Sequence, residues 1–231
     1  MPREPRLPPL LTLVPVPPGG AVLERAAIGA GEGTLGAGDF LVRWNDAIAI
    51  ALVLEPDVSR ETCYSMFPLA EVAIGEALAA IAPPETQVQQ TWMGELVVNG
   101  AIVGAVEGII ENVQEPSWLA VGCRINHAPT QRANPGDDPT RSTLADELGP
   151  LDPVDLIEAI ARHWTAWLHR WETEGWLRVA REWSNRAAPA QTVEHDHGAG
   201  RLLGTDDGGN AIVQTERGPI TVPLASRWRS A

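Results

Sequence analysis

Cys123 is the residue whose type and surroundings suggest covalent chemistry most directly. It precedes Arg124 and lies shortly before His127. A thiol becomes a nucleophile when a nearby cation or histidine lowers its pKa. In a strand, however, adjacent side chains point to opposite faces, so Arg124 would point away from the thiol. Two interpretations follow, a nucleophilic Cys123 and a small buried core cysteine.

Three further groups could support chemistry, and each has a simpler structural interpretation. The run from Glu194 to His197 offers imidazole and carboxylate ligands for a divalent cation, yet a flexible linker rarely fixes the geometry of a metal site. Arg43 is a candidate cation, and a surface ion pair is its alternative role. Glu95 could contact a metal or a ligand hydroxyl, or it could be an exposed hairpin residue without a function. We expect no metal site.

The composition removes whole classes of chemistry. All 17 basic residues are arginine, so the chain has no lysine for a Schiff base, a general base or a phosphate contact. The formal net charge of -13 argues against nucleic acid and anionic membranes as partners. Cys63 and Cys123 have no C-x-x-C partner, which argues against a disulfide framework or a zinc site. We expect a cytoplasmic protein with a proline-rich, extended N-terminal arm.

The stretch from Thr91 to Asn126 must position most of these groups. Two short apolar runs flank Asn99-Gly100, a pair that favours a tight hairpin turn with positive φ at both residues. A third run, 118–125, follows a turn at 115–117. The sequence therefore predicts a three-strand meander, whose glycines suit close approach by a ligand or by another backbone.

Other segments complete an α/β pattern. The apolar run 48–55 is typical of a buried central strand. Asp152 and Pro153 give a helix its cap and its first residue, and Gly175 ends that helix. Its tryptophan stripe indicates core packing rather than a stacking platform. Further helices are expected at 21–30, 68–81 and 177–186, and a long loop at 127–142.

The predicted architecture has two parts. Residues 1–188 form a mixed α/β domain, residues 189–197 a linker, and residues 198–231 a small β-domain. The last part is expected to contain three short strands, joined by turns at 207–209 and 217–218. A unit of that size needs the main domain for stability.

Several strings resemble the biotin/lipoate A/B protein ligase family. The family's W-P-N-D-[hydrophobic] string matches residues 92–96, its N-G-x-K-V-G-G-I string matches 99–106, its V-G-x-G-I-N string matches 121–126, and its A-T-S-L string matches 141–144. The closing helices and the segment 200–213 are also similar. The resemblance implies a mixed-sheet catalytic domain followed by a small SH3-like barrel, and it covers most of residues 20–225.

The departures from the family pattern fall on its chemistry. By this resemblance, the family's lysine beside the acyl-adenylate corresponds to Ile102, and the asparagine and aspartate of W-P-N-D correspond to Gly94 and Glu95. The family's arginine-rich loop before Trp44 is here a glycine-rich segment without arginine. The resemblance implies a ligand pocket that comprises Arg43, Trp92, Gly94, Glu95, Ile102, Gly104, Ala105, Gly122, Cys123 and Asn126.

Two functions remain open at this stage. In the first, the chain is a divergent ligase or acyltransferase that binds or transfers a biotin, lipoyl or octanoyl-type acid, with ATP as the cofactor if the family activity is retained. In the second, it is a non-catalytic binding or assembly factor that contacts a carrier or client protein. A fixed cation beside the phosphate stabilises an adenylation transition state by several kcal/mol. Ile102 cannot supply that cation, and this favours the second function.

Overall fold

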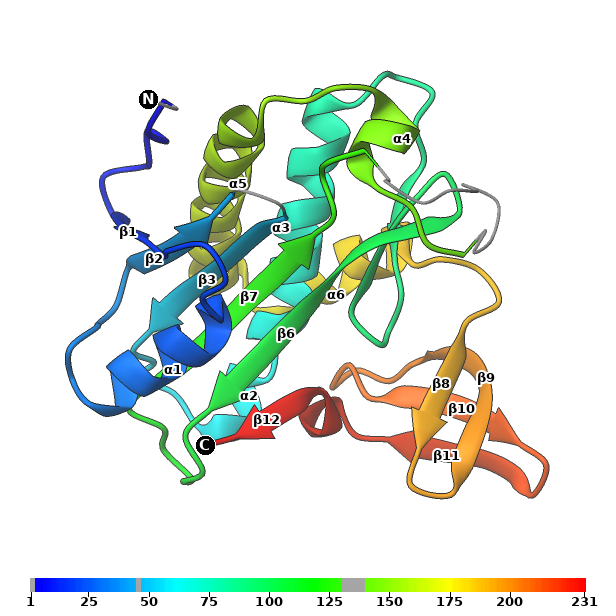
Figure 1. Ribbon diagram of the computed structural model, residues 1–231. Helices are drawn as coiled ribbons and strands as arrows, with labels where there is room; N and C mark the ends of the chain where they lie inside the picture. The colour runs from blue at the N-terminus through cyan, green and yellow to red at the C-terminus, as the bar shows by residue number, and fades with distance from the viewer. Residues whose placement is uncertain (1–2, 45–46, 130–139) are drawn as a thin grey trace.

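One mixed β-sheet forms the centre of the molecule. The computed structural model describes residues 3–44, 47–129 and 140–231. The strand order is β1-β2-β3-β7-β6-β5-β4, and β12 also pairs with β6 (Figure 1). The pairs β1–β2 and β12–β6 are parallel, whereas the other pairs are antiparallel. The bounds are β1 Thr12–Pro15, β2 Asp39–Arg43, β3 Ile48–Leu54, β4 Val88–Gln90, β5 Glu95–Val98, β6 Ala101–Ile110, β7 Leu119–Ile125 and β12 Trp228–Ser230.

The predicted meander is confirmed as strands β5, β6 and β7. Asn99 and Gly100 have φ values of 50° and 87°, and this positive pair is what a type I′ hairpin turn requires. The central strand β3 is buried along nearly its whole length and pairs with β7 from Ile48 to Leu54. Strand β1 lies in the N-terminal arm and adds an edge to the sheet, which the prolines had not indicated.

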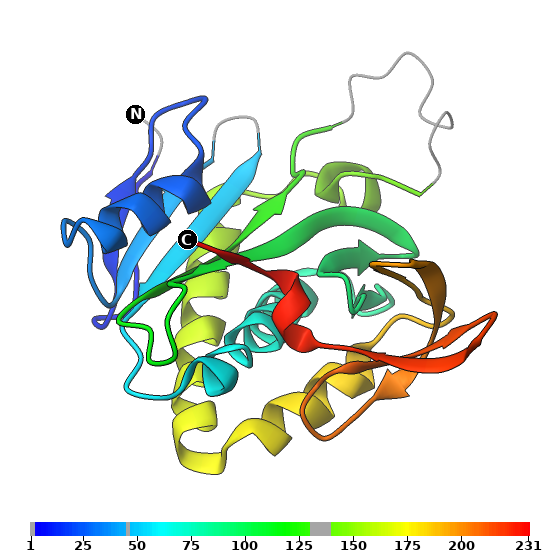
Figure 2. The same cartoon turned by 90° about the horizontal axis from the view of Figure 1, so that it is seen from below.

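Helices cover both faces of the sheet. Helices α3 (Met66–Ile81), α5 (Pro153–Glu174) and α6 (Trp176–Arg186) lie on one face, and α1 (Val22–Gly31) lies on the other (Figure 2). The short helices are α2 (Arg60–Cys63) and α4 (Leu144–Leu148). Asp152 accepts a hydrogen bond from the Val154 amide at 2.9 Å, as expected of an N-cap. Trp164 and Trp167 are fully buried, which confirms the core role of the tryptophan stripe.

The segment Arg60–Ile81 is long and apolar enough to cross a bilayer by composition alone. It contains α3, whose residues from Met66 to Ala73 are all buried inside the protein. This pattern is that of a core helix in a globular domain, which passes the same test of length and hydropathy.

A second, antiparallel sheet lies beside the first and fits a small barrel-like unit. Its strands are β8 (Thr192–His195), β9 (Gly198–Thr205), β10 (Ala211–Thr215) and β11 (Gly218–Val222), in the order β11-β10-β9-β8. The three strands expected in residues 198–231 are present as β9, β10 and β11. A fourth strand, β8, lies in the range that was expected to be a linker. The domain boundaries at 188 and 198 stay a prediction. A 3-10 turn, Leu224–Arg227, then leads the chain back to the main sheet as β12.

Candidate functional site

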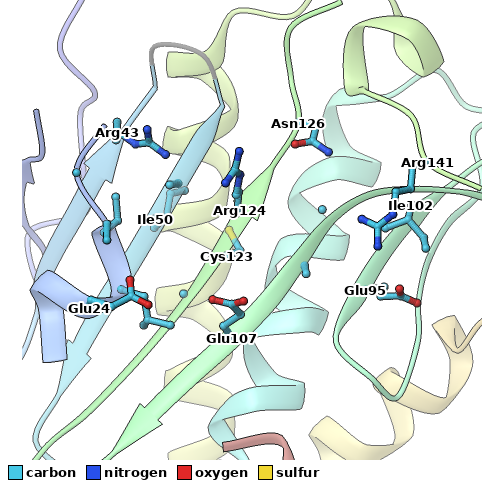
Figure 3. A pocket seen from close by; sticks show the side chains of 18 residues that line it. Glu24, Arg43, Ile50, Glu95, Ile102, Glu107, Cys123, Arg124, Asn126 and Arg141 are labelled. Carbon is cyan, nitrogen blue, oxygen red and sulfur yellow. The ribbon is translucent and has the colours of Figure 1, made fainter. Parts of the chain in front are cut away.

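A cavity of about 570 Å³ opens on the face of the sheet that α1 covers (Figure 3). We call it the central cavity. The start of α1 forms one wall, strands β2, β3, β7, β6 and β5 form the floor, and the segment before α4 contributes Arg141. The lining residues are Gly20, Ala21, Val22, Leu23, Glu24, Arg43, Ala49, Ile50, Glu95, Ile102, Gly104, Ala105, Glu107, Gly122, Cys123, Arg124, Asn126 and Arg141.

One cross-strand row carries charged groups across the floor. Arg43 pairs with Ala49, Ala49 with Arg124, Arg124 with Ala105, and Ala105 with Glu95. Residues that pair directly across strands share a face of the sheet. Two guanidinium groups and one carboxylate therefore stand on the same face, separated by alanines that leave space above the sheet.

The next cross-strand row has residues with small side chains at its centre. Ala51 pairs with Gly122, and Gly122 pairs with Glu107. The glycines of this region are explained by strand packing. A Cβ on Gly122 would lie 2.2 Å from the Ile50 carbonyl oxygen, and a Cβ on Gly104 would lie 2.4 Å from the Arg124 carbonyl oxygen. Another backbone is thus the neighbour that approaches these glycines closely.

Backbone hydrogen bonds bring Arg141 beside Ile102. The Ile102 amide donates to the Thr140 carbonyl at 2.8 Å, and the Ser142 amide donates to the Ile102 carbonyl at 3.0 Å. Arg141 and Ile102 are bridge partners as a result. Asn126 holds the next part of this segment, because its carbonyl accepts from the Leu144 amide at 2.8 Å. Both Arg141 and Ile102 line the central cavity.

Three carboxylates, Glu24, Glu95 and Glu107, also line the cavity. Glu95 contacts the Thr91 hydroxyl at 3.2 Å. Glu24, on α1, accepts a hydrogen bond from Arg229 of β12, and this bond holds the pKa of the Glu24 carboxyl below its ordinary value. Glu107 lies 3.8 Å from the same arginine. The cavity therefore holds fixed charges of both signs.

Cys123 has the properties of a core residue. Its strand neighbour Arg124 is exposed and points to the cavity face, whereas the Cys123 side chain belongs to the core on the opposite face, beneath α3 and α5. Burial raises the pKa of the Cys123 thiol to about 12, and that of Cys63 to about 11. A thiol of this kind is protonated at neutral pH and is a poor nucleophile. The buried core interpretation is the one that these observations support.

Eight of the ten expected pocket residues line the central cavity, and Trp92 and Gly94 do not. Trp92 is buried, and its Nε1 donates to the Gly209 carbonyl in the turn between β9 and β10 at 3.0 Å. Gly94 has a φ of 97°, and a Cβ there would lie 2.9 Å from the Val106 carbonyl oxygen. Both residues are thus explained by packing and by the turn before β5. A ligand-binding role for the remaining eight stays a prediction.

The acidic and histidine run lies on the β8–β9 hairpin. Asp196 and His197 connect the two strands, and the side chains of Glu194 and His197 are exposed. Among the residues that the structure describes, no three histidine, cysteine or acidic side chains come together in a metal-binding group. Part of the loop expected at 127–142 falls at 130–139, outside the described residues.

Sequence reasoning missed four charged residues of the cavity. Arg124 carried a signal, because it interrupts an otherwise apolar or small strand, Leu119–Ile125. Glu107 carried the same signal within β6. Arg141 begins the family string at 141–144 but was not singled out as a pocket residue, whereas only the tertiary structure shows that Glu24 reaches the cavity from α1.

The sequence matches known proteins along most of its length. The model of the biotin/lipoate A/B protein ligase family matches residues 7–185. The chain is similar to the biotin–[acetyl-CoA-carboxylase] ligase of Paracoccus denitrificans, with 27% identity over 188 residues, which cover 75% of this chain and 76% of the relative.

Solved structures of the same kind superpose on this chain. A biotin protein ligase-like protein of unknown function from a Silicibacter species has a TM-score of 0.86 and 28% identity, covering 97% of this chain and 99% of the other. The apo biotin protein ligase of Aquifex aeolicus has a TM-score of 0.72 at 19% identity, covering 92% and 96%. The second likeness concerns the fold alone.

Proposed function

The chain belongs to the biotin/lipoate A/B protein ligase family, and we propose on that premise that it binds a carboxylic acid of the biotin, lipoyl or octanoyl type in the central cavity. The observation that carries the proposal is the placement of Arg43, Arg124 and Arg141, from three separate segments, around one cavity. Guanidinium groups form strong, charge-assisted hydrogen bonds to carboxylates.

The size and lining of the cavity suit such a ligand. Its volume of about 570 Å³ lies within the usual range for small-molecule sites. Ala49, Ala105 and Gly122 provide a low floor on which a short apolar chain can lie. Arg124 stands between the two alanines, where it can contact the acid group of that chain.

An Arg124→Gln variant tests the proposal. A ligand present at 100 times its Kd stabilises a protein by about 2.7 kcal/mol, which for a chain of this length raises Tm by about 5–10 °C. We expect octanoate, lipoate or biotin to raise the Tm of the unaltered protein. The Arg124→Gln variant should need about 10-fold more acid for the same shift, because a hydrogen bond to a charged group is lost.

An Arg217→Gln variant is the matched control, since Arg217 lies exposed at the β10–β11 turn, away from the cavity. It should respond to the acids like the unaltered protein. If none of the three acids shifts the Tm of the unaltered protein, acid binding in the cavity is ruled out.

A second candidate function is family-type activation of the acid with ATP. The backbone bridge between Arg141 and Ile102 supports it, because Ile102 corresponds to the family's lysine by the sequence resemblance. Activation builds negative charge on the α-phosphate, and a nearby cation stabilises that charge. In this function Arg141 would supply the cation.

Hydroxylamine trapping separates the two candidates. Protein, ATP and acid are mixed with hydroxylamine, and an acyl-adenylate appears as the hydroxamate. Hydroxamate from the unaltered protein but not from Arg141→Gln would support activation. Acid binding without hydroxamate would leave a binding factor that presents the acid to, or contacts, a carrier or client protein.

A further inference from the structure

The C-terminal strand β12, from the far end of the chain, contacts two residues that line the central cavity. Trp228, Arg229 and Ser230 pair in parallel with Gly108, Ile109 and Ile110 of β6. Trp228 packs against Gly108, where a Cβ would lie 2.6 Å from the indole ring, and its Nε1 donates to the Tyr64 carbonyl at 3.3 Å. These contacts fix the position of the strand.

The alternation of side chains sends Arg229 to the cavity side of the sheet. Trp228 faces the core beneath α3, where its ring contacts Phe67 at a centroid distance of 5.9 Å. Its neighbour Arg229 must therefore point to the opposite face, where α1 lies. Its partner in the sheet, Ile109, is buried against α1 on that same face.

Arg229 contacts two carboxylates from different elements through one nitrogen atom. Its Nη2 lies 2.9 Å from Oε1 of Glu24 and 3.8 Å from Oε2 of Glu107. Both carboxylates line the central cavity, and Figure 3 shows them on the side opposite Arg43 and Arg124. Arg229 itself lines a neighbouring cavity that shares Ala105 and Glu107 with the central one.

These two carboxylates would oppose the binding of an acid if they were not compensated. Charges within about 10 Å act on a ligand through water, more strongly at low ionic strength and where protein replaces solvent. The charge balance of the cavity thus depends on Arg229. The lowered pKa of Glu24 indicates that this carboxylate is ionised at neutral pH.

We propose that Arg229 is a specificity-determining residue of the central cavity, which offsets part of the negative charge of Glu24 and Glu107 and thereby favours the binding of an anionic ligand. The inference rests on the proposed binding of a carboxylic acid. It adds that the C-terminal strand, which lies beyond the ligase-family match at 7–185, sets the charge of the site.

Calorimetric titration with octanoate and with its neutral analogue octanamide tests this role. In about 10 mM salt, Arg229→Gln should bind octanoate about 3- to 5-fold more weakly than the unaltered protein, because the three charged side chains are about half exposed to solvent, while octanamide binding changes less than 2-fold. The difference should shrink at about 0.5 M salt, since screening weakens charge effects. Arg229→Lys should restore most of the octanoate affinity.

A variant without the Glu24 and Glu107 carboxylates provides the second test. The triple variant with Arg229→Gln, Glu24→Gln and Glu107→Gln should bind octanoate at least as tightly as the unaltered protein, because it loses two negative charges together with the one positive charge. Arg217→Gln is the control for a lost surface charge, and equal Tm values would show that the variants fold alike.

The outcomes separate this inference from the proposed function. No octanoate binding by the unaltered protein would refute the proposed function, and this inference with it. Octanoate binding that is equal in Arg229→Gln would refute this inference alone. Equal losses for octanoate and octanamide would show a structural role for the strand instead of a charge effect, and would also overturn it.

Discussion

Arg124 and its neighbour Cys123 lie on the same strand but in different environments. Successive residues of β7 face opposite sides of the sheet, so the guanidinium group stands in the central cavity and the thiol lies in the core. Cys123, which the sequence offered as a candidate nucleophile, is packed in the core against helices. The residue beside it is exposed to the cavity and carries the charge.

The raised pKa of the Cys123 thiol predicts that it reacts slowly with alkylating reagents. With a pKa of about 12, Cys123 is thiolate in only about one molecule in 10,000 at pH 8. Native protein should therefore react with iodoacetamide far more slowly than protein unfolded in guanidinium chloride. Mass spectrometry of the labelled peptides checks this. Rapid modification of Cys123 in the native state would reopen its role as a nucleophile.

Gly94 and Gly100 form a matched pair for a test of backbone strain. Both have positive φ, but a Cβ at Gly100 meets no atom within 4 Å, whereas at Gly94 it meets the Val106 carbonyl oxygen at 2.9 Å. Gly100→Ala should lower the free energy of unfolding by about 1 kcal/mol. Gly94→Ala should lower it by about 2–3 kcal/mol, because the collision adds to the strain. Urea unfolding compares the two, and equal losses would contradict the packing role of Gly94.

The segment that leads into β12 is held by a buried ion pair. Arg227 lies 2.6 Å from Glu71 of α3, and Trp183 of α6 donates to the same carboxylate at 2.7 Å. The Arg227 guanidinium also stacks over Phe67 at 3.8 Å. Both charged side chains are almost completely buried, so each depends on the other for its stability.

Breaking this ion pair should lower the free energy of unfolding substantially. Arg227→Met should lower the free energy of unfolding by about 3–5 kcal/mol, because it leaves the Glu71 carboxylate buried without its partner. The double variant with Glu71→Gln should recover part of that loss, since the neutral amide can still accept from Trp183. Denaturant unfolding measures both. A double variant less stable than Arg227→Met would contradict the account.

The same pair predicts a dependence on pH. Burial raises the pKa of Glu71 above its ordinary value, with Arg227 opposing the shift. In Arg227→Met the opposition is gone, so the folded state favours the protonated carboxyl. The contribution of Glu71 to the stability of that variant should then be fully present below the ordinary glutamate pKa and should be lost as the pH rises through the raised pKa. The loss of stability caused by Arg227→Met, relative to the unaltered protein, should therefore be larger at pH 8 than at pH 5, and a larger loss at pH 5 would refute this.

Local signals explain which elements could be predicted from the sequence. The Asn99-Gly100 turn, the Asp152 cap and the apolar run of β3 each depend on neighbouring residues, and each was confirmed. The pairing of β12 with β6 joins segments far apart in the chain, and no local pattern marks it. The β8 strand was missed because its polar sequence resembles a linker.

The cavity was predictable only in part for the same reason. Three of the four family strings lie on or beside β5, β6 and β7, so they pointed to residues of those strands, including Glu95 and Ala105. The charged row from Arg43 to Glu95 depends on the register of five strands, which sequence patterns do not specify. Trp92 matched a family string yet packs against the second sheet.

At the scale of the whole molecule, the C-terminal segment returns to the main sheet beside the central cavity. The second sheet follows α6, and the last residues then cross back to β6 (Figure 2). This path lets a C-terminal arginine contact α1, which lies near the other end of the sequence. The protein has a net charge of -13, so the proposed binding of an anionic ligand would require local arginines to offset the charge of the whole protein.

Calorimetric titration of the unaltered protein with biotin, lipoate and octanoate, each compared with its neutral amide, tests the central claim most directly. The account predicts that at least one acid binds with a measurable heat and that its amide binds about 10-fold or more weakly, because the arginines recognise the carboxylate. No heat with any of the three acids, or equal affinities for an acid and its amide, would contradict it.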